Sequence, residues 1–153
     1  MSEQQQAVFS IEKIYLKDLS LEIPNAPQIF TEQETPKIDI NLHNDAHALD
    51  NGLYEVVLTA TVTAKVQEKT AFLVEVAQAG IFRITSDRPQ EFEAMINVAC
   101  PRTLLPYARE TVSTVLARAG FPPVLLPHVG FETIYLQRLQ EQQASAAPAP
   151  VGT

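Results

Sequence analysis

The sequence is poor in cysteine, in glycine and in long apolar stretches, and each shortage excludes a class of protein. Its 153 residues include one cysteine, Cys100, so no disulfide can form within the chain and a disulfide-stapled secreted domain is excluded. Five glycines and the absence of a glycine-rich phosphate motif argue against nucleotide binding. No apolar run is long enough to cross a bilayer. The polar residues 1–6 do not resemble a signal peptide, and we therefore expect a cytoplasmic protein without membrane insertion.

Charged residues are also scarce, at 19%, while apolar residues reach 46%. The formal net charge is −7, and it is concentrated in one part of the chain. Residues 1–60 carry ten acidic and three basic residues, whereas residues 61–153 carry eight of each. Nucleic-acid binding needs clustered Lys and Arg, so nucleic acid is excluded as a partner. Few charges beside many apolar residues favour subunit contacts or an apolar binding surface.

Alternation of apolar and polar residues predicts a set of β-strands. The alternation covers residues 9–23, with a phase change near Lys17 that indicates a bulge, and residues 38–42, 54–66 and 72–84. A bulge is expected at Gly80 as well. Residues 67–69 are short enough to join the last two strands as an antiparallel hairpin. Between the strands, residues 28–36 predict an irregular connection and residues 43–52 a polar loop.

The second half of the chain predicts helices. Helix formers cover residues 90–99, an interruption is expected at Cys100–Pro101, and residues 102–119 and 131–142 show apolar residues at helical spacing. Strands followed by helices indicate an α+β fold, in which an antiparallel sheet carries helices on one face. We expect a single domain over residues 9–143, a flexible N-terminus over residues 1–8 and a disordered Ala/Pro tail over residues 144–153.

Candidate catalytic and metal-binding groups are few. His43 and His47 lie near three aspartates, but on a strand end and in a loop rather than on a helix, so no metal site is expected. Cys100 precedes a proline in an apolar context, which is typical of a buried, inert thiol. A helix starting directly after it could still activate the thiol. One alternative is therefore a small Cys-dependent enzyme that uses Cys100 with His43, His47 or His128.

Apolar side chains also recur outside the predicted strands and helices. Ile29 and Phe30 stand in a proline-bounded connection, and residues 120–127 form an apolar, proline-rich segment followed by Phe131 and Tyr135. These residues complete a core and an oligomer interface, or they form an extended apolar groove that takes unfolded polypeptide.

Five blocks of the sequence resemble the SecB family of bacterial protein-export chaperones. They are YLKDLSLEIPNAP at residues 15–27, YEVVLTATVTA at 54–64, TAFLVEV with GIF at 70–82, CPRTLLPYARE at 100–110 and GFPP at 120–123. The order of the blocks is kept from about residue 9 to about residue 140. The resemblance implies a four-stranded antiparallel sheet with helices and a homotetramer built as a dimer of dimers.

The resemblance also implies a function without catalysis, cofactor or metal. SecB binds unfolded secretory precursor proteins, keeps them translocation-competent and delivers them to the motor ATPase SecA. A related SecB-like chaperone with a different target remains an alternative. Matching positions predict a SecA-binding surface at Asp18, Glu22, Leu73 and Glu75. Val74, Val76 and Gln78 have the opposite strand parity, so they are expected to face inward and form the oligomer interface. By position and chemistry we expect the client-binding groove at Ile29, Phe30, Ile38, Ile40, Leu42, Tyr107, Leu125, Phe131 and Tyr135. Because residues 144–153 carry no charge, the sheet face is expected to carry most of the SecA docking.

Overall fold

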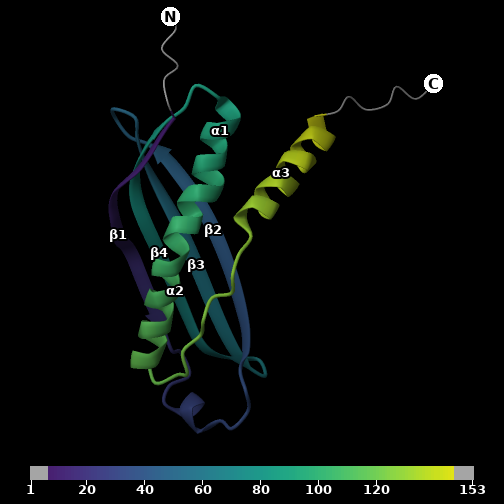
Figure 1. Ribbon diagram of the computed structural model, residues 1–153. Coiled ribbons are helices and arrows are strands. Elements are labelled where there is room, and N and C mark those ends of the chain that lie inside the picture. Colours follow the sequence, from purple (N-terminus) through teal and green to yellow (C-terminus); the bar gives the residue numbers. More distant parts are fainter. Residues whose placement is uncertain (1–6, 147–153) are drawn as a thin grey trace, which may run out of the picture.

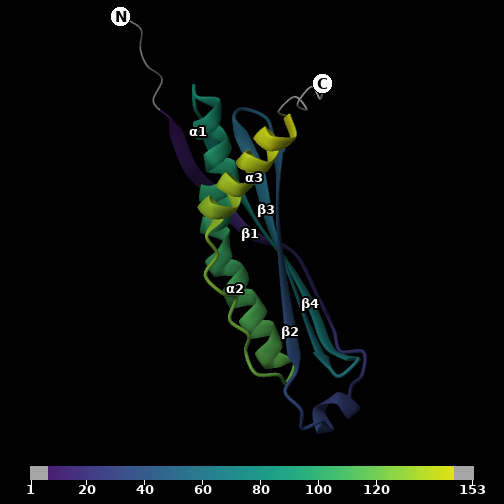
Figure 2. The same cartoon turned by 90° about the vertical axis from the view of Figure 1, so that its right-hand side faces the viewer.

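Four antiparallel strands form one sheet, and the helices pack on one of its two faces (Figures 1 and 2). The computed structural model describes residues 7–146. The strands are β1 (Val8–Glu22), β2 (Lys37–Ala48), β3 (Leu53–Val66) and β4 (Lys69–Thr85), in the spatial order β1-β4-β3-β2. Both β1 and β2 are therefore edge strands. The predicted α+β class, with an antiparallel sheet covered on one face, is confirmed.

The helices follow the sheet in the chain. A 3₁₀ turn, η1 (Gln28–Thr31), lies between β1 and β2, and β4 leads into α1 (Pro89–Ala94), the π-helical η2 (Met95–Ala99), α2 (Cys100–Arg118) and α3 (Phe131–Ala146). Figure 1 shows α1, η2 and α2 as one long rod across the sheet, while α3 projects away from it. None of the helices within residues 7–146 has both the length and the hydropathy needed to span a membrane.

The core lies between α2 and the helix-facing side of the two central strands. Alternate residues of β3 and β4 are buried there, and they meet the apolar stripe of α2 predicted from helical spacing. The residues with no exposed surface include Val56, Leu58, Val62, Phe82, Leu104, Val112 and Leu116. Within residues 7–146, no helix packs on the other face of the sheet (Figure 2). That uncovered face is called the outer face below.

The structure corrects one strand prediction and confirms another. The polar loop expected over residues 43–52 is wrong for residues 43–48, because β2 continues to Ala48 in register with Tyr54. In this part of β2 the residues on the outer face are polar. On the helix-facing side Asn44 is polar and Ala46 is small, so no alternation of apolar and polar residues indicates a strand. The bulge expected near Lys17 is confirmed by a register shift between Leu16 and Asp18.

Gly80 lies in regular pairing with Val56, so the bulge predicted there is wrong. Its lack of a side chain serves packing instead. A Cβ at residue 80 would lie 2.7 Å from Cε2 and 2.9 Å from Cζ of Phe82, a ring with no exposed surface. The strand therefore needs glycine here so that the Phe82 ring can fold back against the backbone.

We expect Gly80→Ala to lower the free energy of unfolding by about 1–3 kcal/mol, because the buried ring of Phe82 has no space into which to retreat. Chemical denaturation of the variant beside the wild type measures this change. Gly52→Ala is a useful contrast, since nothing lies within 4 Å of a Cβ there and its cost comes only from the backbone angle φ of +75°. Equal stability of Gly80→Ala and wild type would contradict the packing argument.

The helical interruption expected at Cys100–Pro101 is also wrong. The chain stays helical from Pro89 to Arg118, because the π-helical turn η2 widens the helix just before Pro101. The backbone N–H of Cys100 donates to the carbonyl of Met95, five residues earlier. One wide turn thus accommodates a proline that cannot donate a hydrogen bond.

The ends of the chain test the predicted domain boundaries only in part. Val8 already belongs to β1, although residues 1–8 were expected to be flexible. At the other end α3 continues through Ala146, three residues into the predicted tail 144–153. The remaining parts of both predictions, residues 1–6 and 147–153, lie outside the described residues.

Candidate functional site

The strand register places the four predicted docking residues together on the outer face. Glu22 pairs with Leu73, and Asp18 lies four residues earlier on β1, opposite Ala77. Glu75 lies between these rows, opposite Ser20. Residues opposite one another on neighbouring antiparallel strands project from the same face. Sequence reasoning had placed these residues on one face of each strand, and the register now joins the two strands into one surface.

The carboxylates of this acidic surface are not neutralised. No ion pair within residues 7–146 involves Asp18, Glu22 or Glu75. Glu75 is exposed, Leu73 is half-buried beside it, and the Thr61 hydroxyl lies 3.5 Å from the Glu75 Oε2. The surface therefore offers negative charge around an apolar contact, which suits a basic partner with an apolar group.

A second polar cluster on the outer face is internally paired. The Lys17 Nζ lies 2.6 Å from the Glu55 Oε1, and the Tyr15 hydroxyl donates to the other oxygen of Glu55. The hydrogen bond from Lys17, followed by that from Tyr15, lowers the pKa of Glu55. Burial, followed by the hydrogen bond to Glu55, raises the pKa of Tyr15 to about 12. Sequence reasoning missed this cluster, because Glu55 lies 38 and 40 residues from its partners.

The predicted oligomer residues lie beneath α2 in the single chain. Val74 and Val76 have no exposed surface and Gln78 has 4%, because all three pack under α2 within one chain. The Gln78 Nε2 donates to the backbone carbonyl of Tyr15 at 3.1 Å. These side chains have no surface left for direct contact with a second chain. They support α2 and the neighbouring strand β1 instead.

Their partners on β1 are exposed apolar residues. On the helix-facing side of β1, Phe9 and Ile14 pack partly against the core, whereas the other large apolar side chains stay exposed. This β1 apolar row consists of Ile11, Leu16, Leu19 and Leu21. An open cavity of 460 Å³ lies between the Leu16 part of this row and α2, and Pro106 and Tyr107 are among its lining residues. Tyr107, predicted to bind client, is 49% exposed beside this cavity.

The other predicted client residues fall into separate places. Ile29 is buried in the core, and Phe30 packs against Phe121 with ring centroids 5.0 Å apart, at the end of α2 remote from α3. Ile38, Ile40 and Leu42 follow one another on the helix-facing side of β2. Leu125 is 70% exposed on the segment that joins α2 to α3. One continuous nine-residue groove is therefore not what the structure shows.

The segment over residues 121–130 crosses from α2 to α3 without regular secondary structure. Arg109 holds it, because its Nε donates to the carbonyl of Leu126 at 2.8 Å. Leu126 is buried while Leu125 points into solvent. Arg109 is thus a positioning residue that sequence reasoning did not single out.

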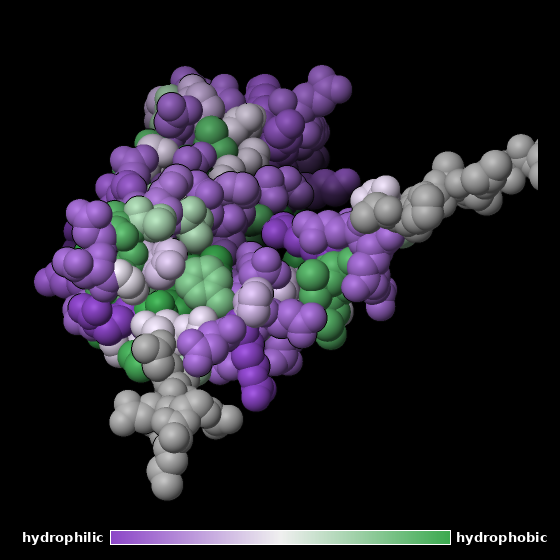
Figure 3. Space-filling model, turned by 90° about the horizontal axis from the view of Figure 1, so that it is seen from above, coloured by the Kyte–Doolittle hydropathy of each residue, from purple (hydrophilic) through white to green (hydrophobic). Residues whose placement is uncertain are grey.

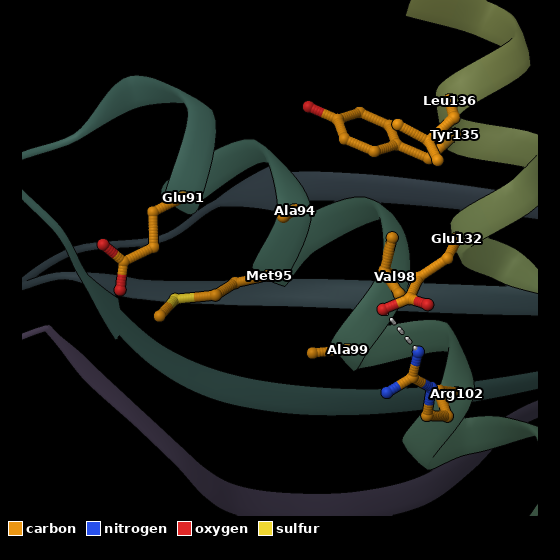
Figure 4. Close-up of a pocket in the computed structure, with 9 residues that line it drawn as sticks. All are labelled: Glu91, Ala94, Met95, Val98, Ala99, Arg102, Glu132, Tyr135 and Leu136. Atoms are coloured by element: carbon orange, nitrogen blue, oxygen red, sulfur yellow. Dashed lines mark ion pairs between the residues drawn. The ribbon is translucent and has the colours of Figure 1, made fainter.

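A second cavity, of 430 Å³, lies between α3 and the helical rod (Figure 4). Its lining is mainly apolar, with Met95 and Val98 from η2 and Leu136 from α3. The Tyr135 ring overhangs the cavity, and its hydroxyl donates to Glu93 at 3.2 Å. One exposed ion pair closes the other end, with 3.3 Å between an Arg102 nitrogen and a Glu132 oxygen. From above, hydrophobic surface shows both in the middle of the molecule and on the projecting arm of α3 (Figure 3).

The geometry does not support the Cys-dependent enzyme. Cys100 has no exposed surface, and burial raises the pKa of its thiol to about 12. The helix runs unbroken through Cys100, so no free helix N-terminus activates the sulfur. His43 and His47 project from the outer face, across the sheet from Cys100. His128 lies on the exposed segment after α2.

Within residues 7–146, no three His, Cys, Asp or Glu side chains come together as a metal site. His47 instead lies 3.1 Å from Asp45 on the exposed outer side of β2.

Comparison with known proteins decides the family. A family model described as "Preprotein translocase subunit SecB" matches residues 2–142. The chain belongs to the SecB family. The protein-export protein SecB of Dechloromonas aromatica is 56% identical over 99% of each chain. That of Chromobacterium violaceum is 58% identical over 97% of this chain and all of its own.

The SecB fold is also found in a distant solved structure. A SecB-like chaperone of Mycobacterium tuberculosis, solved in complex with a peptide of an antitoxin, superposes with a TM-score of 0.66. It is 18% identical and the match covers 80% of this chain and 91% of the other. The SecB family consists of protein-export chaperones, which is not an enzyme class. Chaperone function in protein export is thus the family assignment of this chain.

Proposed function

We propose that this SecB protein is a cytoplasmic holdase that binds unfolded secretory precursors and delivers them to SecA without catalysis of its own. The observation that carries the proposal is the division of the sheet into two surfaces. An acidic surface without ion pairs lies on the outer face, while Ile11, Leu16, Leu19, Leu21 and Ile38 expose apolar surface on the helix-facing side. Two partners could therefore be held at once, on opposite sides of one sheet.

Client binding is assigned to the apolar side. Ile38, Tyr107 and Leu125 expose large apolar surfaces in the free chain, and Tyr135 overhangs the cavity beneath α3. Ile29 and Phe131 are buried and become available only if their segments move. Apolar surface binds through area rather than through a fixed code, so clients are expected to be long, unfolded and rich in apolar residues. Folded proteins hide such segments, which supplies the discrimination.

SecA docking is assigned to Asp18, Glu22, Leu73 and Glu75 on the outer face. Unpaired carboxylates attract a basic partner over a distance and repel other acidic molecules. Leu73, which pairs with Glu22 and lies next to Glu75 on β4, supplies an apolar contact beside these charges. The Tyr15–Lys17–Glu55 cluster is not assigned to SecA docking, because its groups are already paired with one another within the chain.

Assembly into a homotetramer is assigned first to β1. It is a fifteen-residue edge strand, and its apolar row stays exposed although the adjacent residues of β4 are buried. A long unpaired edge with apolar side chains is a template for pairing with another strand. A second copy of this chain fits that description, since it presents the same edge.

A pull-down with an unfolded secretory precursor, with and without SecA, tests the proposal. We expect the precursor to be retained by the chaperone alone, and SecA to join the complex without displacing it at once. Retention of precursor without any binding of SecA would assign the protein to SecB-like chaperones with another target. Failure to retain the precursor would remove the holdase function altogether.

We expect Glu75→Lys to weaken SecA binding about tenfold, because it reverses a charge at the centre of the acidic surface. Client binding should stay unchanged, since Glu75 points away from the apolar side. Titration calorimetry with SecA and, separately, with unfolded precursor measures both. Glu68→Lys, in the β3–β4 turn, is a control of equal charge change. Equal losses of SecA and client binding would refute the separation of the two surfaces.

A further inference from the structure

Asn44 is the polar exception on the helix-facing side of β2, where its neighbours Leu42 and Ala46 are apolar. Its Nδ2 donates to the backbone carbonyl of Ile96 at 3.3 Å. Ile96 lies in η2, and the residue five positions later, which would donate in a π-helical ladder, is Pro101, which has no N–H. The amide nitrogen of Asn44 therefore satisfies a carbonyl that the proline leaves without a helical partner.

The amide oxygen of Asn44 has no such role. It is buried, and no group within residues 7–146 donates a hydrogen bond to it. A buried acceptor without a donor loses its hydration without compensation. Turning the amide over would give the oxygen no better partner, because the carbonyl of Ile96 cannot donate. The oxygen therefore lacks a hydrogen-bond donor within the part of the chain that the structure describes.

Asn44 lines a small cavity of 70 Å³ between β2 and the start of α3. The wall opposite β2 comes from residues 129–138 and includes Val129, Phe131 and Ile134. Phe131 is 7% exposed and lines the cavity together with Asn44, so the start of α3 packs over this part of β2 in the free chain. Movement of the start of α3 would open the cavity and uncover the oxygen.

α3 is attached at its start by the buried Phe131 and, beyond it, by polar contacts between exposed side chains. Its polar ties to the helical rod are the ion pair between Arg102 and Glu132 and the hydrogen bond from Tyr135 to Glu93. Both lie at exposed side chains, where ion pairs contribute little to stability. Figure 1 shows α3 leading away from the rest of the molecule toward its C-terminal end.

We propose that the Oδ1 of Asn44 accepts a backbone N–H of the bound polypeptide once residues 129–138 move off β2. The inference rests on the proposed holdase function and assigns it one polar contact. A backbone N–H occurs in every unfolded polypeptide, so this contact adds affinity without imposing a sequence. It also distinguishes extended chain from folded protein, in which backbone donors are already paired.

The experiment uses two peptide probes and two leucine variants. One probe is an unstructured dodecapeptide rich in Leu and Phe, and the other is the same peptide methylated at alternate backbone nitrogens. Asn44→Leu removes the acceptor, while Asn41→Leu makes the same change on the outer face of the same strand. Asn44→Ala is a second variant of smaller volume. Circular dichroism melting checks that each variant is folded, and fluorescence anisotropy measures each affinity.

We expect Asn44→Leu to bind the unmethylated peptide roughly fivefold more weakly than the wild type, the effect of one net hydrogen bond. The preference of the wild type for the unmethylated peptide should shrink by a similar factor in Asn44→Leu and Asn44→Ala, and persist in Asn41→Leu. An unchanged preference in both Asn44 variants would overturn the inference and leave the holdase function standing. A wild type that binds neither peptide would overturn both.

Discussion

The double variant Leu16→Glu/Leu19→Glu is expected to dissociate the assembled protein into smaller species. Both leucines belong to the β1 apolar row and are about 40% exposed in the single chain. If two copies bury this row against each other, four leucine side chains leave water at each contact. At about 1.5 kcal/mol for each side chain, their loss weakens the contact on the order of 10⁴-fold. Buried, unpaired carboxylates weaken it further.

Light scattering measures the outcome. The wild type should give a mass near four times 16.9 kDa at micromolar concentration. The double variant should give one or two times that chain mass. Val8→Glu/Ser10→Glu is the matched control, because both residues lie on β1 but project from the outer face. A wild type that is monomeric, or a double variant that remains tetrameric, would show that β1 is not the subunit contact.

Native Cys100 is expected to resist alkylation by iodoacetamide at pH 8 about a thousandfold more than the unfolded chain. The reacting species is the thiolate. Burial raises the pKa of Cys100 from 9.0 to about 12, so the thiolate fraction at pH 8 falls from roughly a tenth to roughly one in ten thousand. Steric exclusion acts in the same direction, because the side chain has no exposed surface. Mass spectrometry of samples quenched over time follows the reaction.

The same measurement made in guanidinium chloride supplies the unfolded rate and proves that the reagent is active. As the pH rises from 9 toward 12, the native alkylation rate should rise as well. Burial favours the protonated thiol and raises its pKa to about 12, so the reactive thiolate forms only over this range. Rapid modification of the native protein at pH 8 would show a thiol far more accessible than the core position indicates. That result would also support the alternative of a small Cys-dependent enzyme, against which the buried position of Cys100 argues.

Local patterns were sufficient for the strands and helices that have regular surroundings. The hairpin of β3 and β4 and the apolar stripe of α2 follow from periodicity, because each element buries one regular face. These local patterns failed where a residue elsewhere in the sequence decides the conformation. Gly80 is needed by the ring of Phe82, and the helix passes Pro101 because the π-helical turn η2 precedes it. Neither cause is visible from the residue itself.

By itself the sequence determined the fold class, the family blocks and the shared face of Asp18 and Glu22, since all three depend on residue type and on spacing within one strand. Only the tertiary structure decided which apolar residues stay exposed. Val76 and Leu19 are apolar neighbours in register, yet α2 covers the first and leaves the second in solvent. The unpartnered oxygen of Asn44 likewise depends on a strand and a helix that lie 52 residues apart in the chain. Exposure is set by what packs above a side chain, and that is a property of the folded chain.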